Sequence, residues 1–192
     1  MFVLRVDDEI DLSLPTDSNI EKAFEIVMEN YDHLHEWMPW ANENVSLESI
    51  REFYKRSLKK FANDEDEIGL NIIYKGEVVG GTGFHQIDRV SKSAEIGYWI
   101  IKNATGKGIV TKSVKRLLDY AFDELKLNRI VIKCATENKK SRAIPERLGF
   151  TQEGIEREAG WLHTRFVDHV VYSLLEKEWR EKCKDKKEDN NK

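Results

Sequence analysis

Two glycines flank a lysine just before the most regular helical pattern of the chain, in the stretch Thr105-Gly-Lys-Gly-Ile-Val-Thr111. Glycines let backbone amides converge without side chains in the way, and the start of a helix carries about half a unit of positive charge. Such a turn can hold the oxygens of a phosphate group. The spacing matches neither a Walker A loop nor a dinucleotide-binding motif, and a plain tight turn at Gly106 and Gly108 explains the tripeptide equally well.

A second candidate group follows in Asn138-Lys-Lys-Ser141, between a short apolar strand and a short helix. Taken alone, Asn138 and Ser141 are typical helix-capping residues.

Two strand-like segments carry side chains that could act as a general base, and these are Glu95 and His85. Each has a structural alternative of equal weight: Glu95 as a carboxylate that binds backbone or arginine, and His85 as a half-exposed strand residue. Glu158 is a weaker third candidate, because it is more typical of a solvated charge.

The aromatic stretch around Trp37, Pro39 and Trp40 can form a wall of a binding site. Aromatic clusters are usually core, but Pro39 places this one in a connector between helices, which favours function. The other histidines show no metal-ligand spacing, and the two cysteines lie far apart in the sequence, so we predict no metal site.

These residues are positioned by a predicted mixed α/β (α+β) domain, with a mostly antiparallel sheet and helices on both faces. Asp17 or Ser18 is the expected N-cap of the first helix and Ser46 that of the second. The apolar periods predict helices over 20–27, 47–61, 110–125 and 141–148 and a charged helix after 175, with two short strands within 2–14 and further strands over 68–74, 78–87, 94–101, 128–135, 150–156 and 166–175.

Composition limits the classes of function. The 192 residues carry 31 Lys+Arg against 35 Asp+Glu, a net charge of −4, and about 150 residues suffice for one domain. We predict a single domain over 1–181, a charged flexible tail over 182–192, no membrane span, no direct nucleic-acid binding and a reduced, cytoplasmic location.

Together the segments Ala94-Glu-Ile-Gly-Tyr-Trp99, Gly106-Lys-Gly-Ile109, Asn138-x-x-Ser141 and Leu148-Gly-Phe150 resemble the GCN5-related N-acetyltransferase (GNAT) superfamily. They are most similar to its RimJ/RimL branch, which acetylates the N-termini of ribosomal proteins, and the similarity runs from about Leu12 to Trp179. The resemblance implies the GNAT fold, with a central twisted sheet of about seven strands.

The resemblance also implies a site. Acetyl-CoA would lie in a V-shaped opening between the strand that ends near Ile101 and the strand that begins near Asn128. Asn138 and Ser141 would flank its pantetheine arm and sulfur. The pantetheine would pair with backbone of Trp99, Ile100 and Ile101, and the pyrophosphate with amides of Gly106, Lys107, Gly108, Ile109, Val110 and Thr111.

Three departures from the family pattern are Thr105, Val110 and Pro145. The first two leave the backbone amides in place. Pro145 stands where many relatives carry the tyrosine that protonates the CoA thiolate, so Ser141 becomes the candidate for steadying the departing sulfur.

We therefore predict an N-acetyltransferase that acts on the α-amine of a ribosomal protein, with Ser141, Glu95 and His85 as catalytic candidates. Trp37, Trp40 and His85 would bind the acceptor, and the acidic excess of the chain would attract a cationic amine. The alternatives are acetylation of a small amine and a CoA-binding module without catalysis. The closing strands also allow a homodimer.

Overall fold

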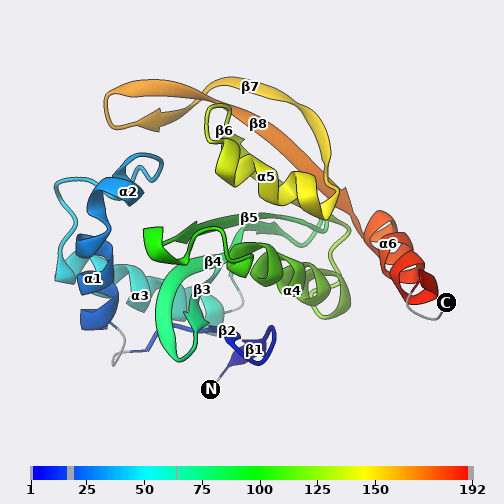
Figure 1. Ribbon diagram of the computed structural model, residues 1–192, viewed down its shortest axis with the longest axis horizontal. Coiled ribbons are helices and arrows are strands. Elements are labelled where there is room, and N and C mark those ends of the chain that lie inside the picture. The colour runs from blue at the N-terminus through cyan, green and yellow to red at the C-terminus, as the bar shows by residue number, and fades with distance from the viewer. Residues whose placement is uncertain (1, 17–19, 64, 190–192) are drawn as a thin grey trace.

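The computed structural model describes residues 2–16, 20–63 and 65–189, shown in Figure 1. The expected caps Asp17 and Ser18 lie outside the described residues. In chain order the elements are β1 (Val3–Arg5), β2 (Ile10–Ser13), α1 (Ile20–Glu29), α2 (Tyr31–His35), α3 (Leu47–Ala62), β3 (Ile68–Tyr74), β4 (Glu77–Asp88), β5 (Ser93–Ile100), a 3-10 turn (Lys102–Ala104), α4 (Ile109–Asp123), β6 (Arg129–Ala135), α5 (Lys139–Leu148), β7 (Thr151–Leu162), β8 (Arg165–Leu175) and α6 (Glu176–Asp189).

The strands form one sheet in the order β1-β2-β3-β4-β5-β6-β8-β7. It has eight strands in the described residues, one more than the expected seven, and β5–β6 is its parallel pair. A parallel pair needs a crossover connection, which α4 supplies. The prediction of a mixed, mostly antiparallel sheet is confirmed.

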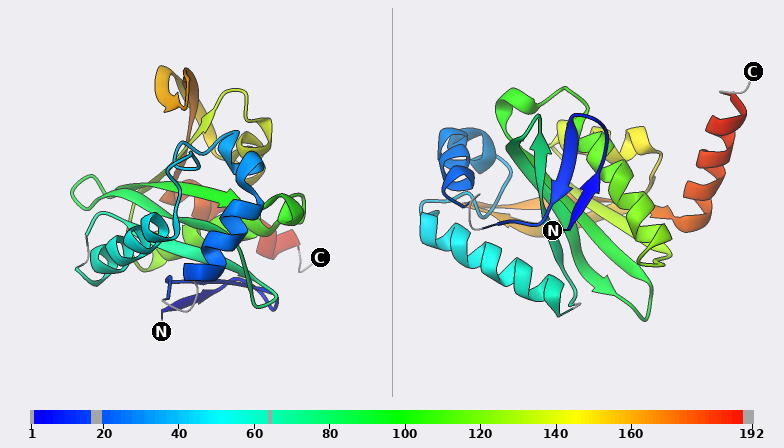
Figure 2. Two further views of the ribbon diagram at one scale, coloured as in Figure 1. Left: turned by 90° about the vertical axis from the view of Figure 1, so that its left-hand side faces the viewer. Right: turned by 90° about the horizontal axis from the view of Figure 1, so that it is seen from below.

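Helices cover both faces of the sheet, as Figure 2 shows in two views. Successive side chains of a strand point to opposite faces. On β5, Ala94 and Ile96 are buried in the main core with Val114 and Leu117 of α4. Trp99, of the other parity, packs with Val27 of α1 and the residues around α2. The two faces of β5 therefore serve two different layers.

Local signals explain several boundaries. Ser46 and Ser49 form a capping box at the start of α3, as expected for the predicted cap. The β3–β4 hairpin turns at Lys75 and Gly76, whose φ angles are 53° and 85°, which is the twist that a two-residue hairpin requires. The connector before Pro39 contains the short helix α2, which the periodicity did not predict because five residues show little of a helical period.

The last helix reaches further than expected. Helix α6 continues to Asp189, so residues 182–189 of the predicted flexible tail are helical. Lys182 Nζ donates to the Gly149 carbonyl, and Cys183 packs against the main core. The division of the chain at residue 181 stays a prediction. Within the described ranges, no helix is both long and apolar enough to span a membrane.

Candidate active site

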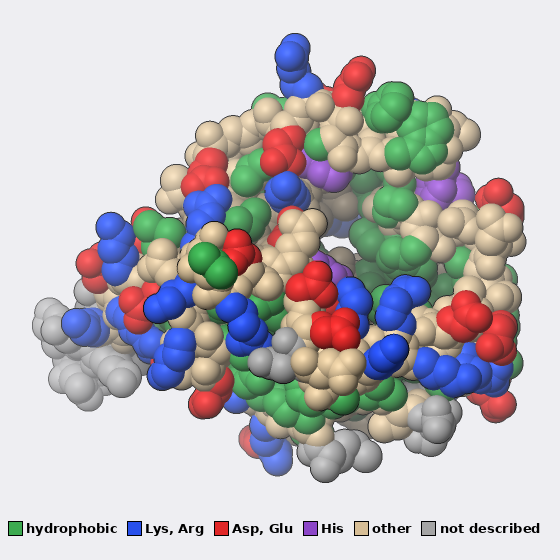
Figure 3. All heavy atoms as spheres, turned by 180° about the vertical axis from the view of Figure 1, so that it is seen from behind, with side chains coloured by type: hydrophobic (Ala, Val, Ile, Leu, Met, Phe, Trp, Pro, Cys, Tyr) green, Lys and Arg blue, Asp and Glu red, His purple; other side chains and the backbone are tan. Residues whose placement is uncertain are grey.

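The sheet opens between β5 and β6. The two strands pair only over Ser93–Glu95 and Arg129–Val131, and they diverge beyond Glu95. A cavity of about 1020 Å³ lies at the wide end, lined by residues from α2, the end of β5, the start of α4 and the start of α5. Seen from behind in Figure 3, the molecule is hollowed near its centre, and apolar and histidine side chains border the hollow. The V-shaped opening that the resemblance implied is present.

The diverging edge of β5 presents backbone groups to this opening. Ile101 N donates to Val79 O of β4 at 2.9 Å. Because the amides of a strand alternate in direction, those of Tyr98 and Ile100 point away from β4, toward the opening. His33 Nε2 of α2 lies 3.2 Å from the Ile100 carbonyl oxygen. A carbonyl only accepts, so His33 carries its hydrogen on Nε2.

The start of α4 is an open set of amides. Gly106 and Gly108 have φ angles of 75° and 74°, and a Cβ at either position would meet nothing within 4 Å. Gly108 is the N-cap residue and offers no side-chain cap to the first turn. The Thr105 hydroxyl donates to the Lys102 carbonyl at 2.7 Å instead. These residues fit a pyrophosphate, because the first amides of α4 face the cavity without a side-chain oxygen to accept from them.

The start of α5 is satisfied within the protein. Asn138 Oδ1 accepts from Ser141 N at 3.1 Å, which confirms that Asn138 acts as the helix cap. The Ser141 hydroxyl lies 3.3 Å from Cys134 Sγ and donates to the Tyr98 hydroxyl oxygen at 3.3 Å. Tyr98 in turn donates to the Ser141 carbonyl at 2.9 Å. Asn138, Ser141 and Tyr98 all line the cavity.

Burial keeps this cluster neutral. It raises the pKa of Tyr98 well above its usual value, and it also raises the pKa of the Cys134 thiol. Both groups therefore stay protonated at neutral pH and act as hydrogen-bonding groups. Pro145 is buried in the interior of α5 and does not line the cavity.

The two candidate bases lie together on the other face of the sheet. His85 and Glu95 are register partners on β4 and β5, on the face that carries Trp99. Burial raises the pKa of Glu95, and nearby Lys133 and His85 oppose that rise. His85 Nδ1 is 3.6 Å from Glu67 Oε1. Neither candidate lines the cavity.

The remaining predicted residues divide into two groups. Trp37 lines the cavity, and Trp40 lies edge-on to the lining residue Trp99 at 5.5 Å between ring centroids. Ile101 and Lys107 are outside the lining, and Lys107 Nζ lies over the Tyr74 ring. The structure brings together these predicted residues in the lining: Trp37, Trp99, Ile100, Gly106, Gly108, Ile109, Val110, Thr111, Asn138 and Ser141.

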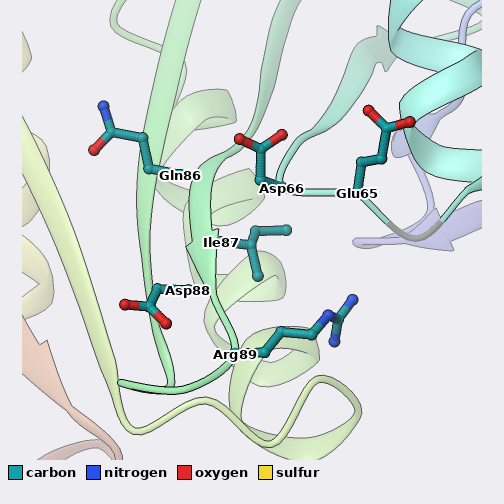
Figure 4. Close-up of a pocket in the computed structure, with 6 residues that line it drawn as sticks. All are labelled: Glu65, Asp66, Gln86, Ile87, Asp88 and Arg89. Carbon is teal, nitrogen blue, oxygen red and sulfur yellow. The ribbon is translucent and has the colours of Figure 1, made fainter.

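A second, shallow hollow lies at the far end of β4 and is shown in Figure 4. Its acidic side chains include Glu65, Asp66 and Asp88, and Asp88 Oδ1 accepts from the amides of Val90 and Ser91 in the following turn. Across the part of the chain that the structure describes, no three His, Cys, Asp or Glu side chains form a group that could hold a metal ion. The expected lack of a metal stays a prediction.

Comparison with known proteins identifies the family. Residues 10–151 match the family described as the acetyltransferase (GNAT) domain. The chain belongs to the GNAT acetyltransferase family. It is therefore an enzyme of the acyltransferase class, and several of its relatives are named as N-acetyltransferases.

Several relatives of this acetyltransferase match over most of their length. It is 37% identical to "Putative ribosomal N-acetyltransferase YdaF" of Bacillus subtilis (strain 168), over 93% of this chain and 98% of that protein. The crystal structure of microcin C7 self immunity acetyltransferase MccE in complex with acetyl-CoA and AMP is 34% identical, covers 88% of this chain and 94% of its own, and has a TM-score of 0.85. RimL, the ribosomal L7/L12 alpha-N-protein acetyltransferase, in complex with coenzyme A, is 25% identical over 91% and 98%, with a TM-score of 0.86.

The sequence left several lining residues of the acetyltransferase unassigned. Arg147 donates to the Thr111 hydroxyl at 2.9 Å and so joins α5 to α4. The basic residues Lys139 and Lys140 beside Ser141 could have indicated the cationic part of the cavity lining. No local sequence pattern indicated that residues of α2 also line it. The lining residues whose side chains had no assigned role are His33, Leu34, Glu36, Met38, Tyr98, Ala104, Thr105, Lys112, Glu137, Lys139, Lys140, Ala143, Ile144 and Arg147.

Proposed function

We propose that this acetyltransferase transfers the acetyl group of acetyl-CoA to the N-terminal α-amine of a protein, with ribosomal proteins as the first substrates to test. The observation that carries the proposal is the cavity, because it joins an open helix start to a hydroxyl cluster across the diverging strands. The relatives named as ribosomal-protein acetyltransferases support the choice of acceptor.

The cosubstrate would bind along the cavity in three parts. The first amides of α4, from Gly106 to Thr111, would hold the pyrophosphate. The amides of Tyr98 and Ile100 would pair with the pantetheine arm and would be the nearest donors to the thioester carbonyl oxygen. Ser141 would then lie beside the sulfur, within the cluster that it forms with Tyr98 and Cys134.

The chemistry is a direct transfer. The acceptor nitrogen forms a bond to the carbonyl carbon, the carbon–sulfur bond breaks, and the amine proton passes to Glu95, directly or through a water. His85 is the alternative proton acceptor. Ser141 donates a hydrogen bond to the departing thiolate. Glu95 lies on the face of the sheet away from α4, and burial raises its pKa. An acceptor that approaches from that face would therefore meet a carboxylate that can take up its proton.

An N-terminal acceptor suits a mild base. At pH 7 an α-amine with a pKa of about 7.8 is roughly a tenth neutral, whereas a lysine with a pKa of about 10.4 is neutral in under one part in a thousand. Trp37 and Trp40 would form the acceptor wall, with Trp40 packed against Trp99. Acetylation of a small amine is the second candidate, because MccE, a relative of high coverage, was solved in complex with acetyl-CoA and the small molecule AMP.

The test is an acceptor panel with labelled acetyl-CoA. It contains N-terminal peptides of ribosomal proteins that also carry an internal lysine, the same peptides with a blocked N-terminus, and small amines such as spermidine. Acetylation at residue 1 of the free peptides and none of the blocked ones is expected. Transfer to small amines alone would establish the second candidate instead. CoA binding without transfer to any acceptor would refute the enzymatic function.

Pairing of two copies through the closing strands stays a prediction. Strand β7 is at the edge of the sheet, so its outer side is available to another chain. Sedimentation of the full chain at several concentrations would measure this association directly.

A further inference from the structure

A proline interrupts the hydrogen bonding of α5 at one carbonyl. In an α-helix the amide of residue i donates to the carbonyl of residue i−4, and Pro145 has no amide hydrogen. The carbonyl that loses its helical partner is that of Ser141, four residues earlier and in the same helix. The helix nevertheless continues through Pro145 to Leu148.

A tyrosine from the sheet takes the place of the missing amide. The Tyr98 hydroxyl of β5 donates to the Ser141 carbonyl at 2.9 Å, and its oxygen accepts from the Ser141 hydroxyl at 3.3 Å. Tyr98 of β5 therefore contacts both the carbonyl oxygen and the hydroxyl oxygen of Ser141 in α5. The proline and the tyrosine are complementary: the first vacates the carbonyl and the second occupies it.

We propose that Tyr98 is the positioning residue for Ser141, and that Pro145 makes this possible by freeing the Ser141 carbonyl. The proposal rests on the proposed function, since it concerns the group that would face the CoA sulfur. With its hydrogen committed to the carbonyl, the Tyr98 oxygen can only accept from Ser141. When CoA binds, the serine hydrogen turns from Tyr98 to the sulfur, and the hydrogen bond from Tyr98 to the Ser141 carbonyl still holds this residue at the cavity wall beside Cys134.

Tyr98 does not itself serve as the acid in this account. Burial raises its pKa well above the usual value, so loss of its proton to a thiolate is unfavourable. The same burial keeps the phenol a donor over the whole working range of pH. Its contribution is therefore geometric, and it is transmitted through Ser141.

A matched control lies on the same helix. Tyr172 of β8 accepts from Arg142 Nε at 3.0 Å and donates to Glu146 at 2.7 Å, so it also attaches α5 to the sheet. It is buried and does not line the cavity. Both tyrosines hold α5 in place, but of the two only Tyr98 has a hydrogen bond to Ser141. A Tyr→Phe change at each position separates positioning of Ser141 from general support of the helix.

The test measures the thiol of bound CoA, with no acceptor present. The ultraviolet absorbance of the thiolate is titrated against pH for CoA bound to the wild type, Tyr98→Phe, Tyr172→Phe and Ser141→Ala. A donor held at the sulfur stabilises the thiolate, so the wild type and Tyr172→Phe should titrate about one pH unit lower than Tyr98→Phe and Ser141→Ala. Equal midpoints for the wild type and Tyr98→Phe would overturn the proposal.

A rescue variant makes the test specific for the carbonyl. Pro145→Ala restores the helical amide, so Tyr98→Phe/Pro145→Ala should recover at least half of the shift that Tyr98→Phe loses. In turnover, Tyr98→Phe should lower kcat about tenfold with an unchanged KM for acetyl-CoA, and it should have no further effect in a Ser141→Ala background. Additive losses, or no recovery in the rescue variant, would overturn it. A normal titration shift without transfer to any acceptor would refute the proposed function but not the positioning role.

Discussion

Two helices begin at the cavity, and they differ in whether a side chain of the protein accepts hydrogen bonds from their first amides. Helix α4 begins after glycines with φ angles of 75° and 74°, and its N-cap residue Gly108 supplies no side-chain acceptor. The N-cap residue of α5 is Asn138, whose side chain accepts from the Ser141 amide. The Tyr98 hydroxyl donates to the Ser141 carbonyl, which lacks a helical partner because of Pro145. The first amides of α4 are therefore free to bind a ligand, whereas at the start of α5 the Ser141 amide is already bonded to the Asn138 side chain.

The difference separates binding from chemistry. Open amides with a helix dipole behind them attract an anion and give affinity. A start whose backbone is already satisfied contributes side chains at fixed positions, which is what a reacting bond needs. We therefore expect changes at α4 to affect the binding of acetyl-CoA and changes at α5 to affect the rate of transfer.

The largest effect is expected from Gly108→Asp. A carboxylate at this position would lie beside the amides that hold the pyrophosphate, and repulsion at about 4 Å amounts to a few kcal/mol near a protein surface. The KM for acetyl-CoA should rise about a hundredfold, while kcat at saturation changes little. Gly76→Asp is the control, because Gly76 also has a positive φ and open surroundings, in a hairpin turn. Similar kinetics for the two variants would contradict the assignment of the anion site.

Ser141→Ala, at the start of α5, should lower the rate of transfer and not the affinity for acetyl-CoA. A hydrogen bond to a charged group contributes about 1.5–3 kcal/mol, so kcat should fall about tenfold to a hundredfold. The KM for acetyl-CoA should stay within about twofold, because α4 supplies the affinity. Ser113→Ala of α4 is the control: this serine is buried, and its hydroxyl has no hydrogen-bond partner in the described structure. A rise in KM that matches the loss in kcat would place Ser141 in binding.

Glu95→Gln should give a smaller loss that depends on pH. A base acts when deprotonated, so the contribution of Glu95 is present above its raised pKa and is lost as the pH falls through that value. Above a pH of about 7.8 the α-amine is already neutral and needs little help. The ratio of kcat/KM between wild type and variant should therefore peak between these two limits, at about tenfold. Glu158→Gln, on β7, is the control, and a ratio that is constant with pH would reject Glu95 as the base.

Asn138→Ala should have the smallest effect and should act on stability. Removal of an Asn cap costs about 1 kcal/mol, so the free energy of unfolding should fall by that amount in urea titrations. The control is Lys140→Ala, an exposed residue of the same turn. An unchanged free energy of unfolding would mean that the first turn of α5 is held by Tyr98 and its packing, not by its cap.

The sequence predicted the parts of the molecule that depend on local pattern. The periodicity of α4, the Ser46 cap and the two groups of site residues were all readable, and the resemblance joined them into one cavity. Helix α2 was too short to show a period. The helical state of 182–189 was hidden by its charged composition, although Cys183 just inside it packs on the core.

The contact between Tyr98 and Ser141 lay beyond the reach of sequence reasoning. The two residues are 43 positions apart, on a strand and a helix, and no spacing rule connects them. Pro145 was interpreted as the loss of an acid, whereas in the structure it also frees the carbonyl that Tyr98 occupies. Glu95 and His85 were correctly placed on strands, but the pairing of those strands and the face that the two residues share depend on register, which strand patterns alone leave open.

Calorimetric titration of acetyl-CoA into the wild type, Gly108→Asp and Ser141→Ala tests the division between the two helix starts most directly. We predict that Gly108→Asp raises the dissociation constant for acetyl-CoA about a hundredfold, and that the dissociation constant of Ser141→Ala stays within about twofold of the wild-type value. Equal affinities for Gly108→Asp and the wild type, or a loss at Ser141 as large as that at Gly108, would contradict it.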